Sequence, residues 1–264
     1  MVNAAVNARI NAQNAALEAA RTPAELFAAI EPKRAMVITA HPDDCEFMCG
    51  GTVAVLTAAG WHVDIMVVTS GNKGTKDPHV TSQQLAGVRE EEQREAARIL
   101  GAHEPIYLGF HDGGVLDNDE LRELIVYQMR RRRPELVITW DGFRSGFNHR
   151  DHRNVGRATY DAIYPAADDH LYHPEHKDEG LEPHRPIVLL LGGQANTGDP
   201  DFYVDIEPVL RRKIRAILAH TSQMRGRTEA DMLRQWRENA ERARAERPDL
   251  PAYREAYRRI ILRR

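Results

Sequence analysis

Short, largely apolar runs are separated along the chain by longer segments of helical pattern. Five runs have the length of a strand, at residues 34–40, 62–69, 105–110, 135–140 and 186–191. Runs that are largely apolar, rather than strictly alternating with polar residues, are typical of parallel strands buried on both faces. The pattern therefore predicts strands at the centre of an α/β fold.

Amphipathic stretches fill the spaces between these runs, and they lie at residues 4–20, 50–59, 83–100, 118–132 and 154–164 and from 207 onward. Another short helix is predicted to begin at Thr22, because Thr22 is a good N-cap, Pro23 suits the first helical position and Glu25 completes a capping box. The alternation from residue 34 onward predicts a Rossmann-like, mostly parallel sheet with helices on both faces. Helical extensions are expected at both ends of the chain.

The domain organisation follows from the absence of any linker composition within the 264 residues. We interpret residues 1–264 as one α/β domain, with an N-terminal helical extension at 1–33 and a C-terminal helical segment at 224–264. The long loop at 165–185 carries four histidines, and loops of that length are usually functional or variable.

Composition narrows the class of protein. The chain is 42% hydrophobic, carries 36 basic and 39 acidic residues, and has two cysteines. Near-neutral charge argues against a nucleic-acid partner, and two cysteines exclude a disulfide framework. No apolar run approaches the roughly 18 residues of a membrane span, and the N-terminus lacks the apolar core of a signal peptide. We therefore expect no nucleic acid, no membrane span and a cytoplasmic location.

Polar residues follow four of the predicted strands, at 41–46, 71–74, 111–114 and 141–152. Ligands of open α/β sheets bind beyond the carboxyl ends of the strands, so these segments are expected to converge on one rim. Among them, His41, Asp44 and His152 form a set of two histidines and one carboxylate, which suits Zn²⁺ and leaves coordination positions open. His41 and Asp44 alone would more often form a capping turn.

The chain resembles the LmbE/PIG-L family of zinc-dependent deacetylases in the segments AHPDDCE (40–46), CGGT (49–52) and HRDH (149–152). The resemblance extends over a core at residues 34–223. It implies a hydrolase that removes the N-acetyl group from an N-acetylglucosamine-type sugar or conjugate. Members of this family often form trimers or hexamers, so a homo-oligomer is also expected.

The same resemblance implies that His41, Asp44 and His152 bind the metal, with Zn²⁺ expected and Fe²⁺, Co²⁺ or Mn²⁺ as alternatives. Amide hydrolysis at neutral pH needs a stronger nucleophile than water, and bound Zn²⁺ lowers the pKa of water to about 7. Asp43 is implied to be the general base of that reaction. Its alternative role is a capping carboxylate at the start of a helix.

A second catalytic position is implied at His149, as general acid and oxyanion stabiliser. Asp151 is predicted to orient His149 and to raise its pKa, as a nearby opposite charge does. Arg150 stands where the family usually has Pro, and Phe147 stands near the position where some relatives have a Tyr.

Three further residues, Arg89, Asp112 and His220, are implied to contact the substrate. Arg89 has the alternative of pairing with a Glu of its own helix, and His220 that of complementing a helix dipole. Cys45 and Cys49 are expected to be small buried hydrophobic residues rather than a second metal site or a redox pair.

Three other functions remain open alternatives. The first is an amidase that cleaves a larger N-acyl group or a thiol-conjugate amide. The second is a sugar-binding protein without catalysis. The third is a nucleotide-dependent Rossmann enzyme, which is disfavoured because the Gly-rich dinucleotide fingerprint is missing.

Overall fold

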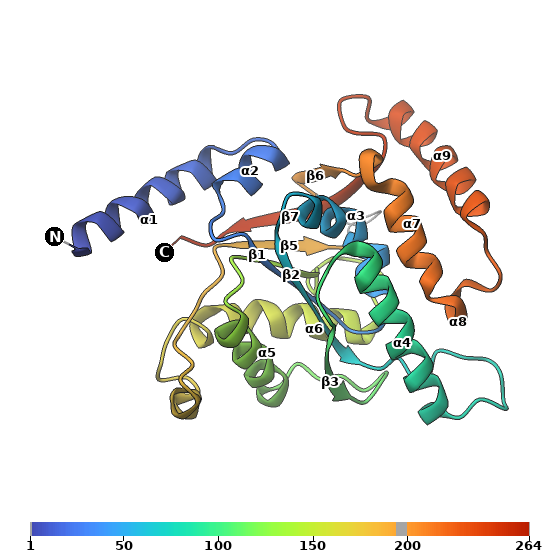
Figure 1. Cartoon of the computed structure of the whole chain (residues 1–264), viewed down its shortest axis with the longest axis horizontal. Helices are drawn as coiled ribbons and strands as arrows, with labels where there is room; N and C mark the ends of the chain where they lie inside the picture. The colour runs from blue at the N-terminus through green and yellow to red at the C-terminus, as the bar shows by residue number, and fades with distance from the viewer. Residues whose placement is uncertain (1, 194–199, 264) are drawn as a thin grey trace.

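The computed structural model describes residues 2–193 and 200–263 and is built around a seven-stranded sheet of order β3-β2-β1-β4-β5-β7-β6 (Figure 1). Neighbouring strands among β1 to β5 pair in parallel, whereas β7 is antiparallel to both β5 and β6. The strands are β1 (Arg34–Thr39), β2 (His62–Thr69), β3 (Ile106–Phe110), β4 (Leu136–Trp140), β5 (Val188–Gly192), β6 (Phe202–Asp205) and β7 (Arg254–Ile261). The predicted mostly parallel sheet is confirmed.

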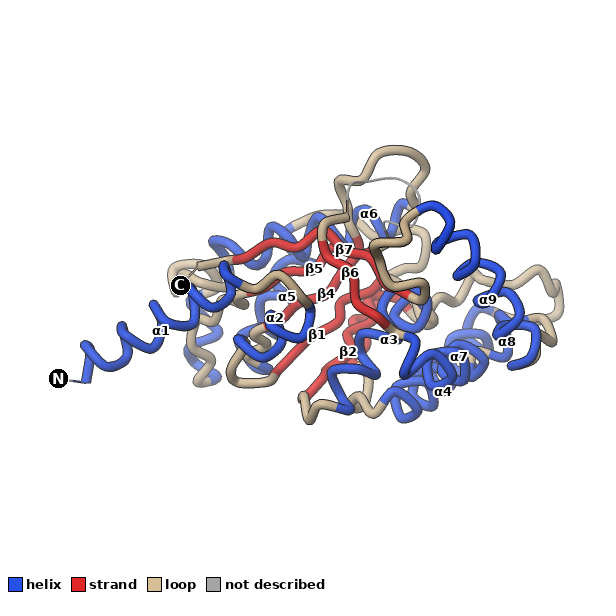
Figure 2. Tube along the Cα trace, turned by 90° about the horizontal axis from the view of Figure 1, so that it is seen from above, coloured by secondary structure: helices blue, strands red, loops and turns tan. Residues whose placement is uncertain are grey.

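Helices cover both faces of this sheet (Figure 2). They are α1 (Val2–Ala19), α2 (Pro23–Ala29), α3 (Asp44–Ala58), α4 (Ser82–Leu100), α5 (Asp119–Arg132), α6 (Arg150–Asp161), α7 (Leu210–Ala219), α8 (Thr221–Met224) and α9 (Glu229–Glu246). The core on one face joins α3, α4 and α7 to the sheet, and the core on the other joins α5 and α6. None of the described helices combines the length and apolar character that crossing a bilayer requires.

The burial of strand β1 explains why its central residues are all apolar. Val37 packs in the core beneath α3 and α4, whereas Met36 and Ile38 pack in the core beneath α5 and α6. All three side chains are fully buried, because alternate residues of a strand point to opposite faces. The predicted capping box before α2 is also present, with Glu25 N donating to Thr22 Oγ1 and Thr22 N donating to the Glu25 carboxylate.

The C-terminal segment 224–264 differs from its predicted helical form. Helix α9 ends at Glu246, and β7 then enters the sheet between β5 and β6. Within β7, Tyr257 is fully buried, and Glu255 accepts hydrogen bonds from the backbone N–H groups of Gly51 and Thr52 on α3. The arginines of this strand obscure its alternating pattern in the sequence.

The histidine-rich loop 165–185 is organised around one buried arginine at the end of α5. Arg130 donates to the carbonyl oxygens of Ala166, Asp169, Tyr172 and His173. Its NH1 also lies 3.3 Å from Nδ1 of His176. Because a guanidinium can only donate, the lone pair of this ring nitrogen accepts the hydrogen bond. Arg130 therefore holds the loop together and does not belong to an exposed basic patch.

Candidate metal centre

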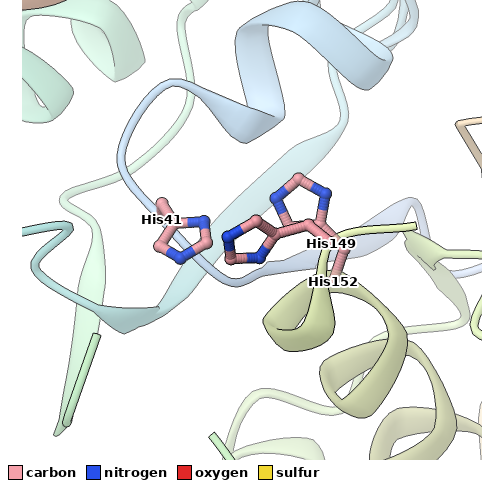
Figure 3. A group of neighbouring side chains, drawn as sticks. All are labelled: His41, His149 and His152. Atoms are coloured by element: carbon pink, nitrogen blue, oxygen red, sulfur yellow. The ribbon is translucent and has the colours of Figure 1, made fainter. Parts of the chain in front are cut away.

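Two adjacent parallel strands bring the predicted ligands together. β1 ends at Thr39 and leads through His41 into α3, while β4 ends at Trp140 and leads to His149, the N-cap of α6, and to His152 in its first turn. β1 and β4 are neighbours in the sheet, so their carboxyl ends open onto the same rim. Figure 3 shows the three imidazole rings gathered around one space.

The carboxylate of Asp44 lies between two of these rings. Its Oδ1 is 3.0 Å from Nε2 of His152, and its Oδ2 is 3.5 Å from Nδ1 of His41. The backbone N–H groups of Ala40 and His41 and the indole N–H of Trp140 donate to Oδ2. Burial opposes ionisation, but the charges and hydrogen bonds of the two histidines hold the pKa of Asp44 well below its usual value.

These spacings fit a metal ion. Four ligands at about 2.0–2.1 Å around a tetrahedral ion lie about 3.3 Å from one another. The two contacts of Asp44, at 3.0 and 3.5 Å, bracket that value. Nitrogens of His41, His149 and His152 also lie within 4.8 Å of one another. Two imidazoles and one carboxylate are donors that Zn²⁺ accepts.

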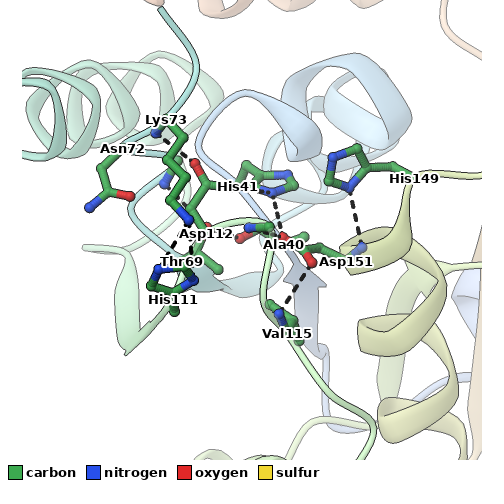
Figure 4. A network of polar contacts seen from close by, with 12 residues as sticks. Ala40, His41, Thr69, Asn72, Lys73, His111, Asp112, Val115, His149 and Asp151 are labelled. Carbon is green, nitrogen blue, oxygen red and sulfur yellow. Dashed lines mark hydrogen bonds and ion pairs between the residues drawn. The ribbon is translucent and has the colours of Figure 1, made fainter. Parts of the chain in front are cut away.

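The second nitrogen of His41 is held by two further carboxylates (Figure 4). Its Nε2 lies 3.2 Å from Oδ1 of Asp112 and 3.2 Å from Oδ2 of Asp151. Burial would lower the pKa of His41, but hydrogen bonds with Asp112, Asp151 and Asp44 raise it to about 12. A carboxylate on the far nitrogen of an imidazole is the usual support of a metal-binding histidine.

The expectation for Asp151 and His149 is corrected by these contacts. The Asp151 carboxylate does not contact the His149 ring; it accepts from the backbone N–H groups of Gly113 and Val115 and faces His41. Only the backbone N–H of Asp151 reaches His149, at 3.2 Å from Nδ1. Burial and the neighbouring His152 and His41 lower the pKa of His149 by more than the Asp151 charge raises it, so the pKa lies below its usual value instead of above it.

Asp43 has an unusual backbone for a residue with a side chain. Its φ of 93° costs about 1–3 kcal/mol in a residue other than glycine. Its N–H donates to Oε1 of Gln93 at 3.0 Å, and its Oδ2 accepts from NH2 of Arg89 at 3.0 Å. The side chain makes no capping hydrogen bond with α3. Burial, together with the charge of Asp44, raises the pKa of Asp43 to about 7.

Arg89 lies behind Asp43 and not at the open side of the site. It is 5% exposed, and its NH1 donates to the carbonyl oxygen of Gly71 at 2.7 Å. Its NH2 donates to the carbonyl oxygen of Pro42 and to Asp43. Neither the predicted substrate contact nor the alternative pairing with a Glu of its own helix describes these bonds. Arg89 joins the loops that follow β1 and β2.

His220 also lies away from the position predicted for it. It follows the end of α7, is fully buried, and places Nε2 3.1 Å from Oε2 of Glu46. Its charge also acts on Asp43, so His220 lies beneath the centre, bonded to Glu46, rather than at an open surface. Asp112, in contrast, lies against His41 at the centre, and its Oδ2 accepts from the backbone N–H of Lys73 at 2.8 Å.

Sequence reasoning missed two residues of this centre, Trp140 and Gln93. Trp140 stacks on His152 with ring centroids 4.0 Å apart and an angle of 4° between the planes. Gln93 bridges Asp43 and Glu46, since its Nε2 donates to Oε1 of Glu46 at 2.8 Å. The available signal was spacing: Gln93 follows Arg89 by four residues and so shares its helix face.

The chain is similar in sequence to several known deacetylases. The family model described as GlcNAc-PI de-N-acetylase, PIG-L, matches residues 36–163. The diacetylchitobiose deacetylase of Thermococcus kodakarensis is 35% identical over 193 residues, which cover 72% of this chain and 70% of that protein. The 1D-myo-inositol 2-acetamido-2-deoxy-alpha-D-glucopyranoside deacetylase of Actinosynnema mirum is 27% identical, with 73% and 81% covered.

Solved structures share the fold. N,N'-diacetylchitobiose deacetylase from Pyrococcus horikoshii superimposes with a TM-score of 0.77 at 26% identity, covering 89% of this chain and 85% of that one. The 4-carboxy-2-hydroxymuconate hydratase GalB of Pseudomonas putida has a TM-score of 0.72 at 21% identity, covering 88% and 98%, and shows likeness of fold alone. By its motifs, its sequence relatives and its fold, this chain belongs to the PIG-L, or LmbE-like, family of N-deacetylases.

Proposed function

We propose that this protein hydrolyses the acetamide of an N-acetylglucosamine-type sugar or conjugate, with Zn²⁺ held by His41, Asp44 and His152. The products are acetate and a free amine. The deacetylase relatives support the reaction class and the type of sugar. The observation that carries the metal assignment is the Asp44 carboxylate between two imidazole nitrogens, at 3.0 and 3.5 Å.

When bound, Zn²⁺ supplies Lewis-acid chemistry by lowering the pKa of water and polarising the amide carbonyl. Asp43 takes the proton of the attacking water, because it is next to Asp44 in the chain but bonds neither histidine ligand in the described structure. The proton is then available for the departing amine nitrogen, so the reaction ends with Asp43 as it began.

His149 is assigned to the developing oxyanion. Its Nδ1 accepts from the backbone N–H of Asp151, so the proton of the neutral ring is on Nε2. An N–H donor of this kind stabilises the negative charge of a tetrahedral intermediate. The hydrogen bond at Nδ1 favours this role over that of general acid, because a doubly protonated ring could not accept at Nδ1.

Arg89 and Gln93 act as positioning residues through Asp43. One holds its carboxylate and the other its backbone N–H, and both project from α4. The positive φ of Asp43 is unfavourable on its own, so these two bonds stabilise the direction in which the carboxylate points.

One observation supports the alternative of a larger acyl group. A cavity of about 460 Å³ shares Trp140 with the metal centre, and Phe47, Met48 and Trp236 contribute to its mainly apolar lining. Pockets of this size accommodate small apolar ligands. Release of acetate from glucosamine conjugates, compared with release of longer acyl chains from the same amine, separates the two functions.

The experiment that tests the proposal is mass spectrometry of N-acetylglucosamine conjugates incubated with zinc-loaded protein. We expect loss of an acetyl group, and loss that is slower by about 10²- to 10⁴-fold with Asp43→Asn loaded with the same amount of zinc. Absence of turnover on chitobiose-, inositol- and malate-linked conjugates, with zinc bound, would contradict the proposed substrate class. Sugar binding without turnover would favour the non-catalytic alternative.

A further inference from the structure

A second group of possible metal donors lies at the amino ends of the parallel strands, opposite the rim that carries the metal centre. His62 begins β2, Asp64 follows two residues later on the same strand, and His103 lies between α4 and β3. In the sheet register His62 is opposite Arg34, the first residue of β1, whereas His41 follows the last. Six residues of strand, at about 3.3 Å each, separate the two ends by roughly 20 Å.

The buried carboxylate of this group is poorly bonded. The Asp64 side chain is 3% exposed, yet its partners within the described residues approach no closer than 3.4 Å. Its Oδ2 is 3.4 Å from Nε2 of His62, and its Oδ1 is 3.5 Å from Nδ1 of His103. Ordinary hydrogen bonds measure about 2.7–3.2 Å, so both contacts of Asp64 with the imidazoles are longer than ordinary hydrogen bonds.

The backbones of the two histidines are fixed where their rings meet. The backbone N–H of His103 donates to the carbonyl oxygen of Val63 at 3.0 Å. The backbone N–H of His62 donates to the carbonyl oxygen of Lys33 at 2.9 Å. The ring centroids of His62 and His103 are 3.6 Å apart with planes at 84°, so the edge of one ring meets the face of the other. Two imidazoles on one tetrahedral ion have centroids roughly 5 Å apart, so one of these half-exposed rings must rotate outward for both to bind. Donor spacings of 3.4 and 3.5 Å match the roughly 3.3 Å between ligands of a tetrahedral ion.

We propose that His62, Asp64 and His103 form a second site for a divalent transition-metal ion such as Zn²⁺, which joins the start of β2 to the segment preceding β3. The half-exposed histidines leave coordination positions open to water, which fits an exchangeable ion. Arg132 NH1, 3.9 Å from Oδ1 of Asp64, opposes a cation and limits the affinity.

Zinc bound per chain, measured by equilibrium dialysis and elemental analysis in micromolar free zinc, tests this site. We expect the Asp44→Ala/His152→Ala protein, which lacks the proposed catalytic ligands, to retain one zinc ion per chain. Adding His103→Ala should remove it, whereas adding His170→Ala, which changes an exposed histidine elsewhere, should not. Zinc should also raise Tm by a few degrees, and this rise should disappear with His103→Ala.

Two outcomes would overturn the second site. One is absence of zinc from the Asp44→Ala/His152→Ala protein, and the other is equal zinc binding with and without His103. His62→Gln provides an independent variant on the other ligand and should behave as His103→Ala does. Because the test is done without the catalytic ligands and reads no activity, failure of the proposed deacetylase function would leave its result unchanged.

Discussion

NH2 of Arg89 lies 3.0 Å from Oδ2 of Asp43. Two residues earlier in the same turn, Nε2 of His41 lies 3.2 Å from each of two carboxylates. The arginine is buried and also bonds the carbonyl oxygens of Pro42 and Gly71. The ion pair therefore fixes the proposed base to the loops that follow two strands. The sequence motif alone could not tell whether Arg89 holds Asp43 in place or contacts the substrate.

Replacing Arg89 distinguishes these roles. We expect Arg89→Gln to lower kcat by about 10- to 100-fold with little change in KM, because the Asp43 carboxylate loses its partner while the substrate loses none. Steady-state kinetics on protein of measured zinc content checks this. A raised KM with unchanged kcat would instead favour the direct substrate contact, and Gln93→Ala should reproduce the Arg89 effect in weaker form.

The base itself is tested by an isosteric change. Asp43→Asn should bind zinc as the unchanged protein does and lose about 10²- to 10⁴-fold in kcat, because the amide cannot take a proton from water. Elemental analysis and acetate release give the two quantities. Turnover within a few-fold of the original would remove Asp43 from the role of base.

Replacing each of the two histidines at the start of α6 should affect zinc content differently. His152→Ala removes a proposed ligand and is expected to abolish tight zinc binding. His149→Ala should keep zinc and lower kcat by about 10²- to 10³-fold, the effect of losing one oxyanion donor. Loss of zinc in His149→Ala would mean that this ring is a ligand, a role for which its nitrogen is near enough to His41 and His152.

The ion pair between Lys213 and Glu255 predicts an effect on stability outside the metal centre. The pair is 2.5 Å long, its side chains are 1% and 3% exposed, and it joins α7 to β7. Lys213→Met should lower the free energy of unfolding by about 3–5 kcal/mol, because Glu255 then keeps a buried charge without its cation. Urea denaturation measures this loss.

A matched control for that prediction is Arg211→Met, which removes an exposed cation paired with Glu229 on a neighbouring helix. Its expected effect is below about 1 kcal/mol, as for most surface ion pairs. Similar effects of the two substitutions would show that burial of the Lys213 pair contributes little.

Much of the fold could be predicted from the sequence because β1, β2, β4 and β5 are buried on both faces and so are largely apolar. β7 could not, because its arginines lie among buried residues such as Tyr257, and pairing with β5 across a long separation has no local signal.

The site shows the same division between local and distant information. The meeting of His41, Asp44 and His152 was predictable, since parallel strands place their carboxyl ends on one rim. Burial of Arg89 and His220, and the turn of Asp151 toward His41, depend on how α4, α7 and α6 pack, which no motif spacing contains. Those three residues are where the structure changed the interpretation.

Acetate release after metal removal and replacement decides whether the centre at His41, Asp44 and His152 is catalytic. Protein stripped of metal by a chelator, with the loss verified by elemental analysis, should release no acetate from N-acetylglucosamine conjugates. Returning one equivalent of Zn²⁺ should restore activity to the original protein but not to Asp44→Ala/His152→Ala. Full activity in verified metal-free protein, or full activity of that double variant, would contradict a metal-dependent deacetylase at this site.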